Sequence, residues 1–391
     1  MIELTNLPDM SCNSVKGSVH ISPEGHIKPC CYFKNMGPHW KYWQVDSNMS
    51  NIDSLDGIVN SYEWNNFVSP NPHCEFCIKE EATDIHSLRQ YWNETISSDT
   101  TKLQYLELAL DFTCNMMCRI CGPRQSSKWN VSPVLKNMEE ECEDSINYVK
   151  IKGSKEYTNN IKRILANSDL SELKKVILVG GEPLYSKTLP WFINLLKKQE
   201  HWKDIRLRII TNGSIVPSKD LFEGFKRVEL DVSLDAFGDL ATATRMKVPW
   251  ETIDANIREM MKLYKVFIHT TVSNLNCNQI DPLIQYCHDL NISPYAHTFT
   301  LLHGPKHLSL DLIPKEYRQK WKISPYKEFH YNKLNNMLEI DYHESPSDVQ
   351  SFLRAVEILD TESELSFRDV NPEIMKIMED LFKDYQSDNK I

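Results

Sequence analysis

The distribution of cysteines is the feature of this sequence that most constrains its fold. The chain has 391 residues and 11 cysteines, and nine of these cysteines lie before residue 150. Cysteines that only fill a hydrophobic core would be spread more evenly along the chain. The N-terminus has neither the basic nor the apolar segment of a signal peptide, so we expect a reducing, cytoplasmic location. There, clustered cysteines hold metal more often than they form disulfides.

Composition excludes several classes of protein. Hydrophobic residues make up 41% and charged residues 25%, which is typical of a globular chain and not of a disordered one. The net charge of −10 argues against general nucleic-acid binding. No window approaches 18 consecutive apolar residues, so we expect no membrane-spanning helix.

The first hundred residues are irregular and rich in proline and glycine. Short strands are predicted at Gly17–Ile21 and His26–Cys30, joined as a hairpin by the turn Ser22–Gly25. Such a segment buries little apolar surface by itself, and a bound metal would stabilise it.

After residue 100, apolar runs alternate with amphipathic stretches, which predicts an α/β fold with a parallel sheet. The predicted strands are Leu103–Leu110, Val176–Val179, Ile205–Ile210, Arg227–Leu234, Val266–Val272 and Ile292–Thr298. The predicted helices are Tyr157–Ala166, Lys187–Gln199, Ser218–Phe225, Trp250–Tyr264 and Gln279–Leu290. Six strands suit an open, partial barrel with its functional residues at the carboxyl ends of the strands. Residues 301–391 are predicted to form a mainly helical extension, a solvated cap.

Three cysteines follow the first of these strands in the spacing C-x3-C-x2-C, at Cys114, Cys118 and Cys121. Three thiolates on a cubic iron–sulfur cluster leave one iron without a protein ligand, and that iron can chelate a small molecule. An incomplete zinc site is the alternative.

This spacing resembles the signature of the radical S-adenosylmethionine (radical SAM) enzymes. The resemblance implies a partial (β/α)6 barrel in which a reduced 4Fe–4S cluster cleaves SAM and releases a 5′-deoxyadenosyl radical. That radical abstracts a hydrogen atom from the substrate. The family's aromatic residue before the third cysteine is Ile120 here, a departure that weakens a contact with adenine more than the cluster itself.

Further segments resemble the family in the order expected. Gly180, Gly181, Glu182 and Pro183 match the GGEP motif that holds the methionine amine of SAM, although a plain turn between strand and helix is the alternative. Asn212 ends the next strand, where it is predicted to line the SAM pocket or to form an ordinary Asn-Gly turn.

The later strand ends supply the remaining candidates. Ser233 is predicted to contact the ribose or carboxylate of SAM, and Asp235 either to bind the cofactor or to cap a helix. Arg245 lies where relatives often place an arginine near SAM, with a surface arginine as the alternative. Further pocket-lining candidates are Thr271, Ser273 and Asn274.

A second group of cysteines precedes the barrel. Cys12, Gly25, Cys30, Cys74 and Cys77 follow the pattern C-x12-G-x4-C…C-x2-C, which resembles the twitch domain, a half-size relative of the SPASM domain. The resemblance implies an auxiliary 4Fe–4S cluster held by these four cysteines, and zinc is the alternative. In most relatives this module follows the barrel. Cys31 is a neighbour or substitute ligand, while Cys142, Cys277 and Cys287 are predicted to be buried hydrophobic residues.

Together these features predict a cytoplasmic radical SAM enzyme with two clusters and three parts. The parts are a twitch-like module (1–100), a radical SAM partial barrel (101–300) and a helical extension (301–391). The resemblance implies SAM as cofactor, a donor such as flavodoxin or ferredoxin, and a peptide or protein substrate. Oxidation or rearrangement of a small molecule is the alternative reaction. A non-catalytic iron–sulfur or zinc protein for electron transfer is the rival from another class.

Overall fold

The computed structural model describes residues 11–22, 25–33, 52–61, 64, 74, 77–78, 81, 86–123, 125–134, 155–302, 304–321, 323 and 328–388. The contacts divide the chain into two compact units. The first unit comprises residues 1–113, 147–209 and 218–228, and the second comprises 114–146, 210–217 and 229–391. Each unit therefore combines segments that are distant in sequence. The three parts predicted from the sequence are continuous ranges, unlike these two units, and that division stays a prediction.

The structure is an α/β fold built on parallel strands. Their bounds are β1 Ser18–Ile21, β2 Ile27–Lys28, β3 Tyr105–Ala109, β4 Lys175–Val179, β5 Arg206–Thr211, β6 Arg227–Ser233, β7 Lys265–Val272 and β8 His297–Leu301. In the first unit β1, β3, β4 and β5 run parallel in that order, and in the second unit β6, β7 and β8 do so. The predicted strands are confirmed, except that the last begins later, at His297, because a 3₁₀ turn occupies Pro294–Ala296.

The N-terminal hairpin is part of the sheet of the first unit. Strands β1 and β2 pair antiparallel, with Ile21 opposite Ile27, and Gly25 in the turn has a φ of +78° that favours glycine. Strand β1 also pairs parallel with β3, where Val19 lies opposite Leu106. Glu107 of β3 meets His20 of β1 across this pairing, at 3.3 Å. The hairpin therefore extends the parallel sheet, which its sequence did not indicate.

The helices follow the predicted alternation. Their bounds are α1 Ser14–Gly17, α2 Leu55–Val59, α5 Leu88–Thr95, α6 Ser127–Asn130, α8 Lys155–Asn167, α9 Leu189–Leu196, α10 Gly238–Thr244, α11 Trp250–Leu263, α12 Ile280–Asp289, α13 Lys315–Arg318, α14 Glu328–Leu338, α15 Pro346–Asp360, α16 Phe367–Val370 and α17 Pro372–Ser387. The prediction of a helix at Ser218–Phe225 was wrong, since a 3₁₀ turn covers only Lys219–Phe222. Among the described residues, no helix has the length and apolar character needed to cross a membrane.

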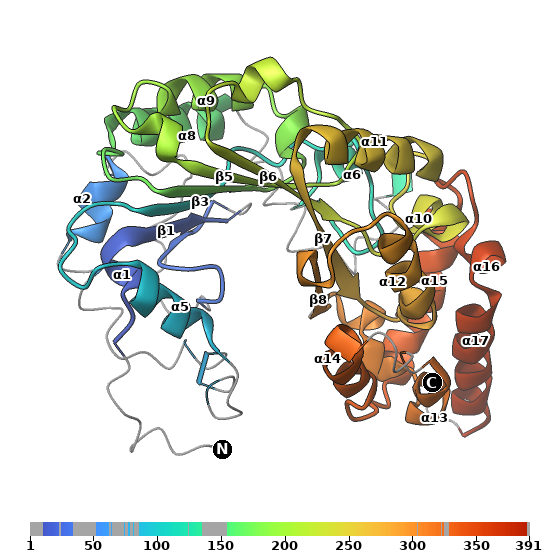
Figure 1. Ribbon diagram of the computed structural model, residues 1–391. Helices are drawn as coiled ribbons and strands as arrows, with labels where there is room; N and C mark the ends of the chain where they lie inside the picture. Colours follow the sequence, from blue (N-terminus) through green and yellow to red (C-terminus); the bar gives the residue numbers. More distant parts are fainter. Residues whose placement is uncertain are drawn as a thin grey trace. The chain divides into compact units, whose positions relative to one another are not determined.

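Alternating burial explains how the first unit is layered. Leu106 and Leu108 of β3, and Val176 and Leu178 of β4, are at most 1% exposed, whereas their neighbours along each strand are mostly half-buried. Residues two apart share a face of the sheet, so these leucines and valines form one apolar layer. Helices α8 and α9 cover one face of these strands (Figure 1).

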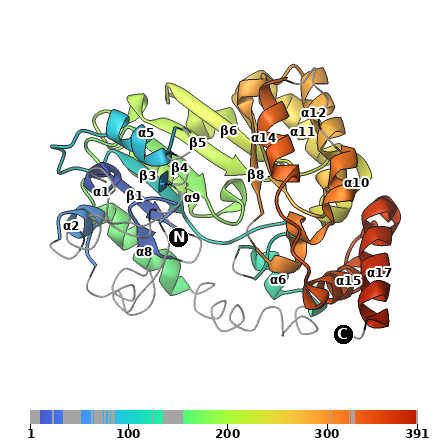
Figure 2. The same cartoon turned by 90° about the horizontal axis from the view of Figure 1, so that it is seen from below.

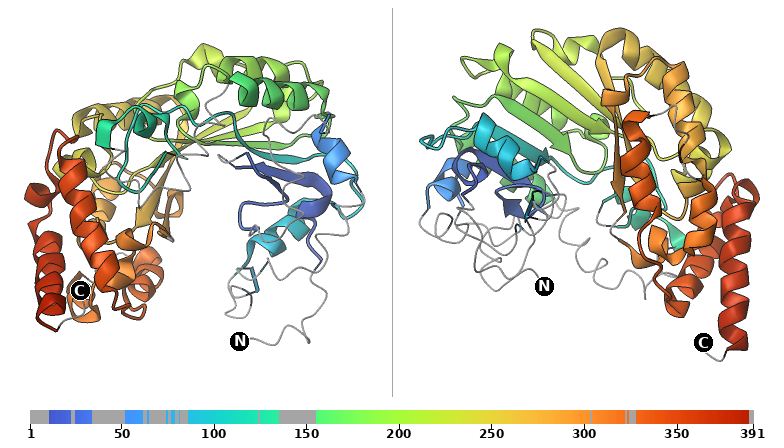
Figure 3. Two further views of the ribbon diagram at one scale, coloured as in Figure 1. Left: turned by 180° about the vertical axis from the view of Figure 1, so that it is seen from behind. Right: turned by 60° about the horizontal axis from the view of Figure 1, so that its bottom comes forward.

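The C-terminal helices form a core with the barrel segments of the second unit. Phe352 of α15, Phe367 of α16 and Met378 of α17 are fully buried in one cluster that includes Val272 of β7 and Phe299 of β8. Helices α15 and α17 lie side by side (Figure 2), and Figure 3 shows them from two further sides. The interpretation of residues 301–391 as a solvated cap was therefore wrong, because these helices bury their apolar faces against the strands.

Candidate metal and cofactor site

The loop at residues 114–121, here called the cluster loop, lies in the second unit and is fixed by backbone hydrogen bonds. The amide of Arg119 donates to the carbonyl of Thr244 at 2.9 Å, and the amide of Met117 donates to the carbonyl of Met246 at 3.4 Å. The loop therefore runs beside the chain that leaves the end of α10. This contact places the three cysteines of the loop in one part of the second unit.

The structure brings two of the three predicted thiols together directly. The Cys121 amide donates to the Cys118 carbonyl at 3.1 Å, and the neighbouring Cys121 together with burial raises the pKa of Cys118 well above its usual value. Cys114 is also buried. Backbone and side-chain N–H groups point at its sulfur, since the Met116 amide lies 3.5 Å and Asn212 Nδ2 lies 3.8 Å from Sγ.

These surroundings fit a cluster bound through thiolate sulfurs. Donors such as the Met116 amide and the Asn212 amide group stabilise negative charge on a ligating sulfur. Asn212 is held in place because it also donates to Asn115 Oδ1, at 3.1 Å. Among the described histidines, cysteines, aspartates and glutamates, no three are arranged closely enough to hold a single metal ion.

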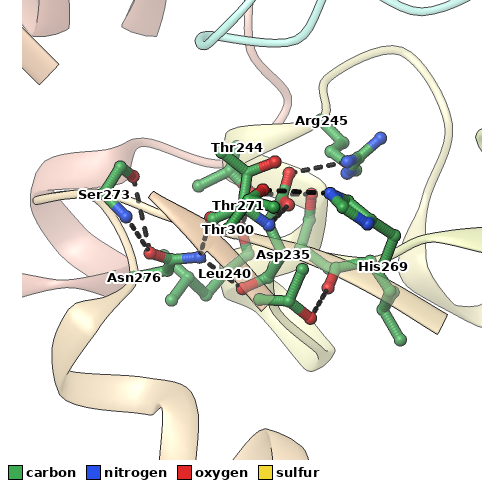
Figure 4. Close-up of polar contacts among 12 residues, drawn as sticks. Asp235, Leu240, Thr244, Arg245, His269, Thr271, Ser273, Asn276 and Thr300 are labelled. Carbon is green, nitrogen blue, oxygen red and sulfur yellow. Dashed lines mark hydrogen bonds and ion pairs between the residues drawn. The ribbon is translucent and has the colours of Figure 1, made fainter. Parts of the chain in front are cut away.

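Arg245 and Asp235 form a buried ion pair in the same unit (Figure 4). Arg245 Nη2 lies 2.6 Å from Asp235 Oδ2, and both side chains are less than a tenth exposed. Burial lowers the pKa of Arg245, but Asp235 and the thiols of Cys118 and Cys121 outweigh that effect and raise it. In the part of the chain that the structure describes, the buried Nε of Arg245 has no hydrogen-bond partner, which leaves one donor for a ligand. Arg245 is therefore not a surface arginine.

Asp235 is held by further hydrogen bonds, and it does not cap a helix. Its Oδ1 accepts from the Thr271 amide at 2.9 Å, and its carbonyl accepts from Asn276 Nδ2 at 2.8 Å. Helix α10 begins after Phe237, and no side chain caps it. Asp235 therefore orients Arg245 instead of offering free oxygens to a ligand.

The polar residues near Asp235 include several that sequence reasoning missed. Asn276 bridges Asp235 and Ser273, and the ring of His269 lies 3.0 Å from the hydroxyl of Thr300 (Figure 4). His269 was hidden within an apolar run, and only its place at the half-buried positions of β7 could have indicated it. Ser233 ends β6, opposite His269, and is half-buried.

Asn274, one of the pocket-lining candidates, is engaged elsewhere. Its Nδ2 donates to the carbonyl of His307 at 2.9 Å, and the residue is fully buried. Ser273 is also buried, and its Oγ accepts from the Leu275 amide at 3.2 Å. Both side chains therefore brace the loop after β7.

In the first unit, two glycines let backbone segments approach closely. Gly180 has a φ of +112°, and a Cβ on it would lie 2.6 Å from the carbonyl oxygen of Asp111. A Cβ on Gly181 would lie 2.4 Å from the carbonyl oxygens of Phe112 and Thr113. Thr113 directly precedes Cys114 in the chain, so the GGEP motif packs against the residues that lead into the cluster loop.

Glu182 is 1% exposed and is positioned by both backbone and side-chain bonds. Its amide donates to the Thr113 carbonyl at 2.8 Å, and its Oε1 accepts from the Leu184 amide at 3.0 Å. Pro183, which is buried, begins the 3₁₀ turn that Glu182 caps. The turn predicted as the alternative is thus present, and it holds the carboxylate of Glu182 rigidly.

The four N-terminal cysteines influence one another. Burial raises the pKa of the Cys30 thiol, and the charges of Cys12, Cys77 and Cys74 raise it further. Burial, Cys12 and Cys77 likewise raise the pKa of Cys74 to about 11. All four cysteines belong to the first unit, where their charges act on one another.

A basic side chain lies beside these thiols. The charge of Arg89 partly offsets the rise in the pKa of Cys74. The pKa of Arg89 is itself raised, mainly by its hydrogen bond with Glu81 and to a smaller extent by Cys12 and Cys77. Arg89 forms a close ion pair with Glu81. A cation here favours thiolates over thiols, as a metal cluster requires.

Comparison with known proteins identifies the domain that contains the cluster loop. Residues 112–287 match the family model described as the radical SAM superfamily. This segment begins two residues before Cys114 and includes the GGEP motif, Asn212, Asp235 and Arg245. Residues 112–287 therefore match a radical SAM domain.

The curated relatives share part of their length with this chain. GTP 3′,8-cyclase of Aliarcobacter butzleri (strain RM4018) is 26% identical over 230 residues, which are 56% of this chain and 64% of the cyclase. GTP 3′,8-cyclase of Campylobacter lari (strain RM2100 / D67 / ATCC BAA-1060) is 30% identical over 137 residues, 34% of this chain and 35% of that protein. The chain thus matches less than two thirds of the length of either relative.

Solved structures resemble the chain only distantly. Hexahistidine-tagged anSMEcpe with bound AdoMet is 14% identical, with a TM-score of 0.37 over 66% of this chain and 57% of that one. Streptococcus suis SuiB bound to S-adenosylmethionine is 16% identical, with a TM-score of 0.35 over 59% and 45%. Scores this low carry no conclusion about substrate.

Proposed function

We propose that this protein is a radical SAM enzyme, which binds a 4Fe–4S cluster through Cys114, Cys118 and Cys121 and abstracts a hydrogen atom from an organic substrate. The observation that carries the proposal is the turn that joins Cys118 and Cys121, in which the Cys121 amide donates to the Cys118 carbonyl at 3.1 Å, in the same matched segment as the buried Arg245. When bound, the cluster and SAM supply a 5′-deoxyadenosyl radical.

The chain's own residues bind and orient SAM in this proposal. Arg245, held by Asp235, offers its buried Nε–H to the carboxylate of SAM. Glu182 accepts from the amino group, and Ser233 contacts the ribose. Asn212 donates to the sulfur of Cys114 and so orients a ligand of the cluster.

The four cysteines of the first unit are proposed to hold an auxiliary 4Fe–4S cluster. The mutual influence of Cys12, Cys30, Cys74 and Cys77, with Arg89 beside them, supports this assignment. Four protein ligands complete such a cluster, so its role is electron transfer or structural support and not direct binding of substrate. If the same four thiols are found to bind zinc, the assignment of an auxiliary 4Fe–4S cluster is wrong.

For the substrate, we keep a peptide or protein as the first candidate from the sequence. The similarity to GTP 3′,8-cyclases favours the second candidate, a small molecule such as a nucleotide. An external flavodoxin or ferredoxin is the proposed electron donor.

Anaerobic reconstitution tests the chemistry directly. We expect about eight irons per chain, since each cubic cluster holds four, and release of 5′-deoxyadenosine when the protein is reduced with SAM. Cys118→Ala should abolish that release, whereas Cys287→Ala, which removes a buried thiol of α12, should retain it. Unchanged release from Cys118→Ala would exclude the assigned cluster.

Isotope transfer distinguishes the two classes of substrate. The reduced enzyme and SAM are incubated in turn with deuterated nucleotides and with deuterated peptides from the source cell. Deuterium in 5′-deoxyadenosine identifies the class whose hydrogen is abstracted. Transfer from nucleotides alone would contradict the peptide proposal while leaving the enzyme class intact.

A further inference from the structure

The cluster loop carries an arginine, Arg119, for which the sequence predicted no role. Arg119 lies between Cys118 and Cys121 in the sequence and is 4% exposed. Its Nε donates to the carbonyl of Ala243 at 2.8 Å, and its Nη2 forms a close ion pair with Asp360. The guanidinium also lies 5.5 Å from the centre of the Phe367 ring.

Asp360 is the last residue of α15 and is itself held firmly. It accepts from the Phe367 amide at 2.9 Å and from the Ser366 hydroxyl at 2.7 Å. Asp360 therefore joins the end of α15 to the start of α16 and presents its carboxylate to Arg119. A residue 241 positions away in the sequence thus fixes the side chain that separates two cluster cysteines.

Apolar packing brings α15 to the same place. Residues of α15 pack in a small core cluster with three other segments. These segments are the cluster loop, α6 with the turn that follows it, and the chain after α10. The members of this core cluster are Met117, Trp129, Val134, Met246, Ala355 and Leu359. Trp129 also donates from Nε1 to the Cys118 carbonyl at 3.3 Å. Figure 2 shows α6 near α15.

A second polar link lies beside the first. Lys247 follows the segment that pairs with the cluster loop, and its Nζ bonds Glu362 through both the carbonyl, at 2.7 Å, and Oε2, at 2.9 Å. Arg119 depends on Asp360 more strongly, because its buried Nη1 has no hydrogen-bond partner among the described residues and only Nη2 reaches a carboxylate. Loss of Asp360 would leave a buried charge with one carbonyl contact.

We propose that Asp360 is a positioning residue for the metal site: through Arg119 it holds Cys118 and Cys121 in the arrangement that binds the cluster. The proposal rests on the assignment of these cysteines to the cluster. The C-terminal helices thereby act on the chemistry of the barrel without supplying a ligand. Residues that orient metal ligands typically change metal affinity by roughly 10–100-fold when they are replaced.

The test measures the cluster itself in the full-length, reconstituted protein. Only the cluster with an open iron responds to SAM, so the change in its electron paramagnetic resonance spectrum on adding SAM reports on this site alone. For Asp360→Asn we expect iron loss to a chelator to accelerate by roughly tenfold or more and the SAM-dependent change to diminish.

Three further variants make the result specific. Arg119→Lys keeps the positive charge but loses the forked geometry of the guanidinium, and it should show a milder form of the same defect. This variant serves as the test if Asp360→Asn folds poorly. Arg119→Gln combined with Asp360→Asn replaces the ion pair by neutral hydrogen-bonding groups and should restore iron retention in part. Glu379→Gln breaks an ion pair with Arg368 on the exposed side of the same extension and should retain the wild-type spectrum.

Two outcomes would overturn the proposal, and they are distinguishable. If Asp360→Asn lowers the melting temperature but keeps the wild-type iron-loss rate and SAM response, Asp360 only supports the fold. If Cys118→Ala binds iron and responds to SAM as the wild type does, the cluster assignment fails, and the positioning role fails with it.

Discussion

At the scale of single residues, the two most informative side chains are the buried charges of the second unit. Arg245 and Asp235 form an ion pair with little access to water, and removing one partner of such a pair costs far more than the pair contributes. The Nε–H of Arg245 has no acceptor among the residues that the structure describes. A buried donor without an acceptor destabilises a fold, so a ligand that accepts from this N–H would stabilise the protein.

Arg245→Lys tests this interpretation. A lysine keeps the charge near Asp235 but cannot make the ion pair and donate to a carboxylate from a second, fixed position. We expect SAM affinity to fall by about tenfold, near 1.4 kcal/mol, in anaerobic calorimetry of the reconstituted protein. Arg258→Lys, in an exposed pair with Asp254, is the matched control and should bind SAM as the wild type does. Equal SAM affinities for Arg245→Lys and the wild type would show that Arg245 does not bind SAM.

At the scale of elements, the GGEP turn shows how a short segment positions a carboxylate. Gly181 allows the turn to lie against the backbone of Phe112 and Thr113, and Glu182 is buried by that close approach. Gly181→Ala should therefore cost about 1–3 kcal/mol in chemical denaturation, because the added Cβ meets backbone oxygens that cannot move aside. Gly304→Ala, whose Cβ would meet no atom of the described residues within 4 Å, is the control. Equal midpoints for the two variants would contradict the close packing.

The junction of α11 and α12 gives a prediction on pH. Burial acts to raise the pKa of Asp254, but hydrogen bonds from Arg258 and from the Tyr286 hydroxyl, at 2.6 Å, outweigh it and hold that pKa below its usual value. The stabilisation is present above the unfolded pKa of about 3.9 and is lost as the pH falls through the lower folded pKa.

Asp254→Asn should therefore lose about 1 kcal/mol at pH 7, and the difference from the wild type should shrink below about pH 4. Denaturant titrations at several pH values measure this difference. Glu259→Gln, in an exposed pair with Lys262, should change stability by less than about 0.5 kcal/mol. A difference for Asp254→Asn that persists into acid would show that the carboxylate charge is not its source.

At the scale of the whole molecule, the cysteines divide between the two units. Cys12, Cys30, Cys74 and Cys77 belong to the first unit, and the cluster loop belongs to the second. Loss of one N-terminal cysteine should therefore leave the other site loaded. For Cys74→Ala we expect iron to fall from about eight to about four per chain, with the SAM-dependent spectrum retained. Cys31→Ala, at an exposed cysteine, should keep about eight irons. Zinc in place of the missing iron in the wild type would contradict the auxiliary cluster.

The strands and the candidate ligands could be predicted because their signals are local. A buried strand needs an apolar run, as in Val176–Val179, and a metal loop needs thiols at short spacing, as in Cys114–Cys121. The predicted helix at Ser218–Phe225 failed because a few apolar residues at helical spacing suit a 3₁₀ turn equally well.

The sequence by itself determined the order of strands and helices, the class of the domain and which cysteines are candidates for metal. Only the tertiary structure decided which side chains meet. Arg119 and Asp360 are separated by most of the chain, and no periodicity records a contact between an arginine in a loop and the end of a helix. The same holds for β1, whose pairing with β3 depends on long-range hydrogen bonds between backbones of any sequence. Apolar periodicity and cysteine spacing depend on the conformational preferences of neighbouring residues, so the sequence shows them. The partners of buried charges and of strand edges are distant in the sequence, and they are fixed only when the chain folds.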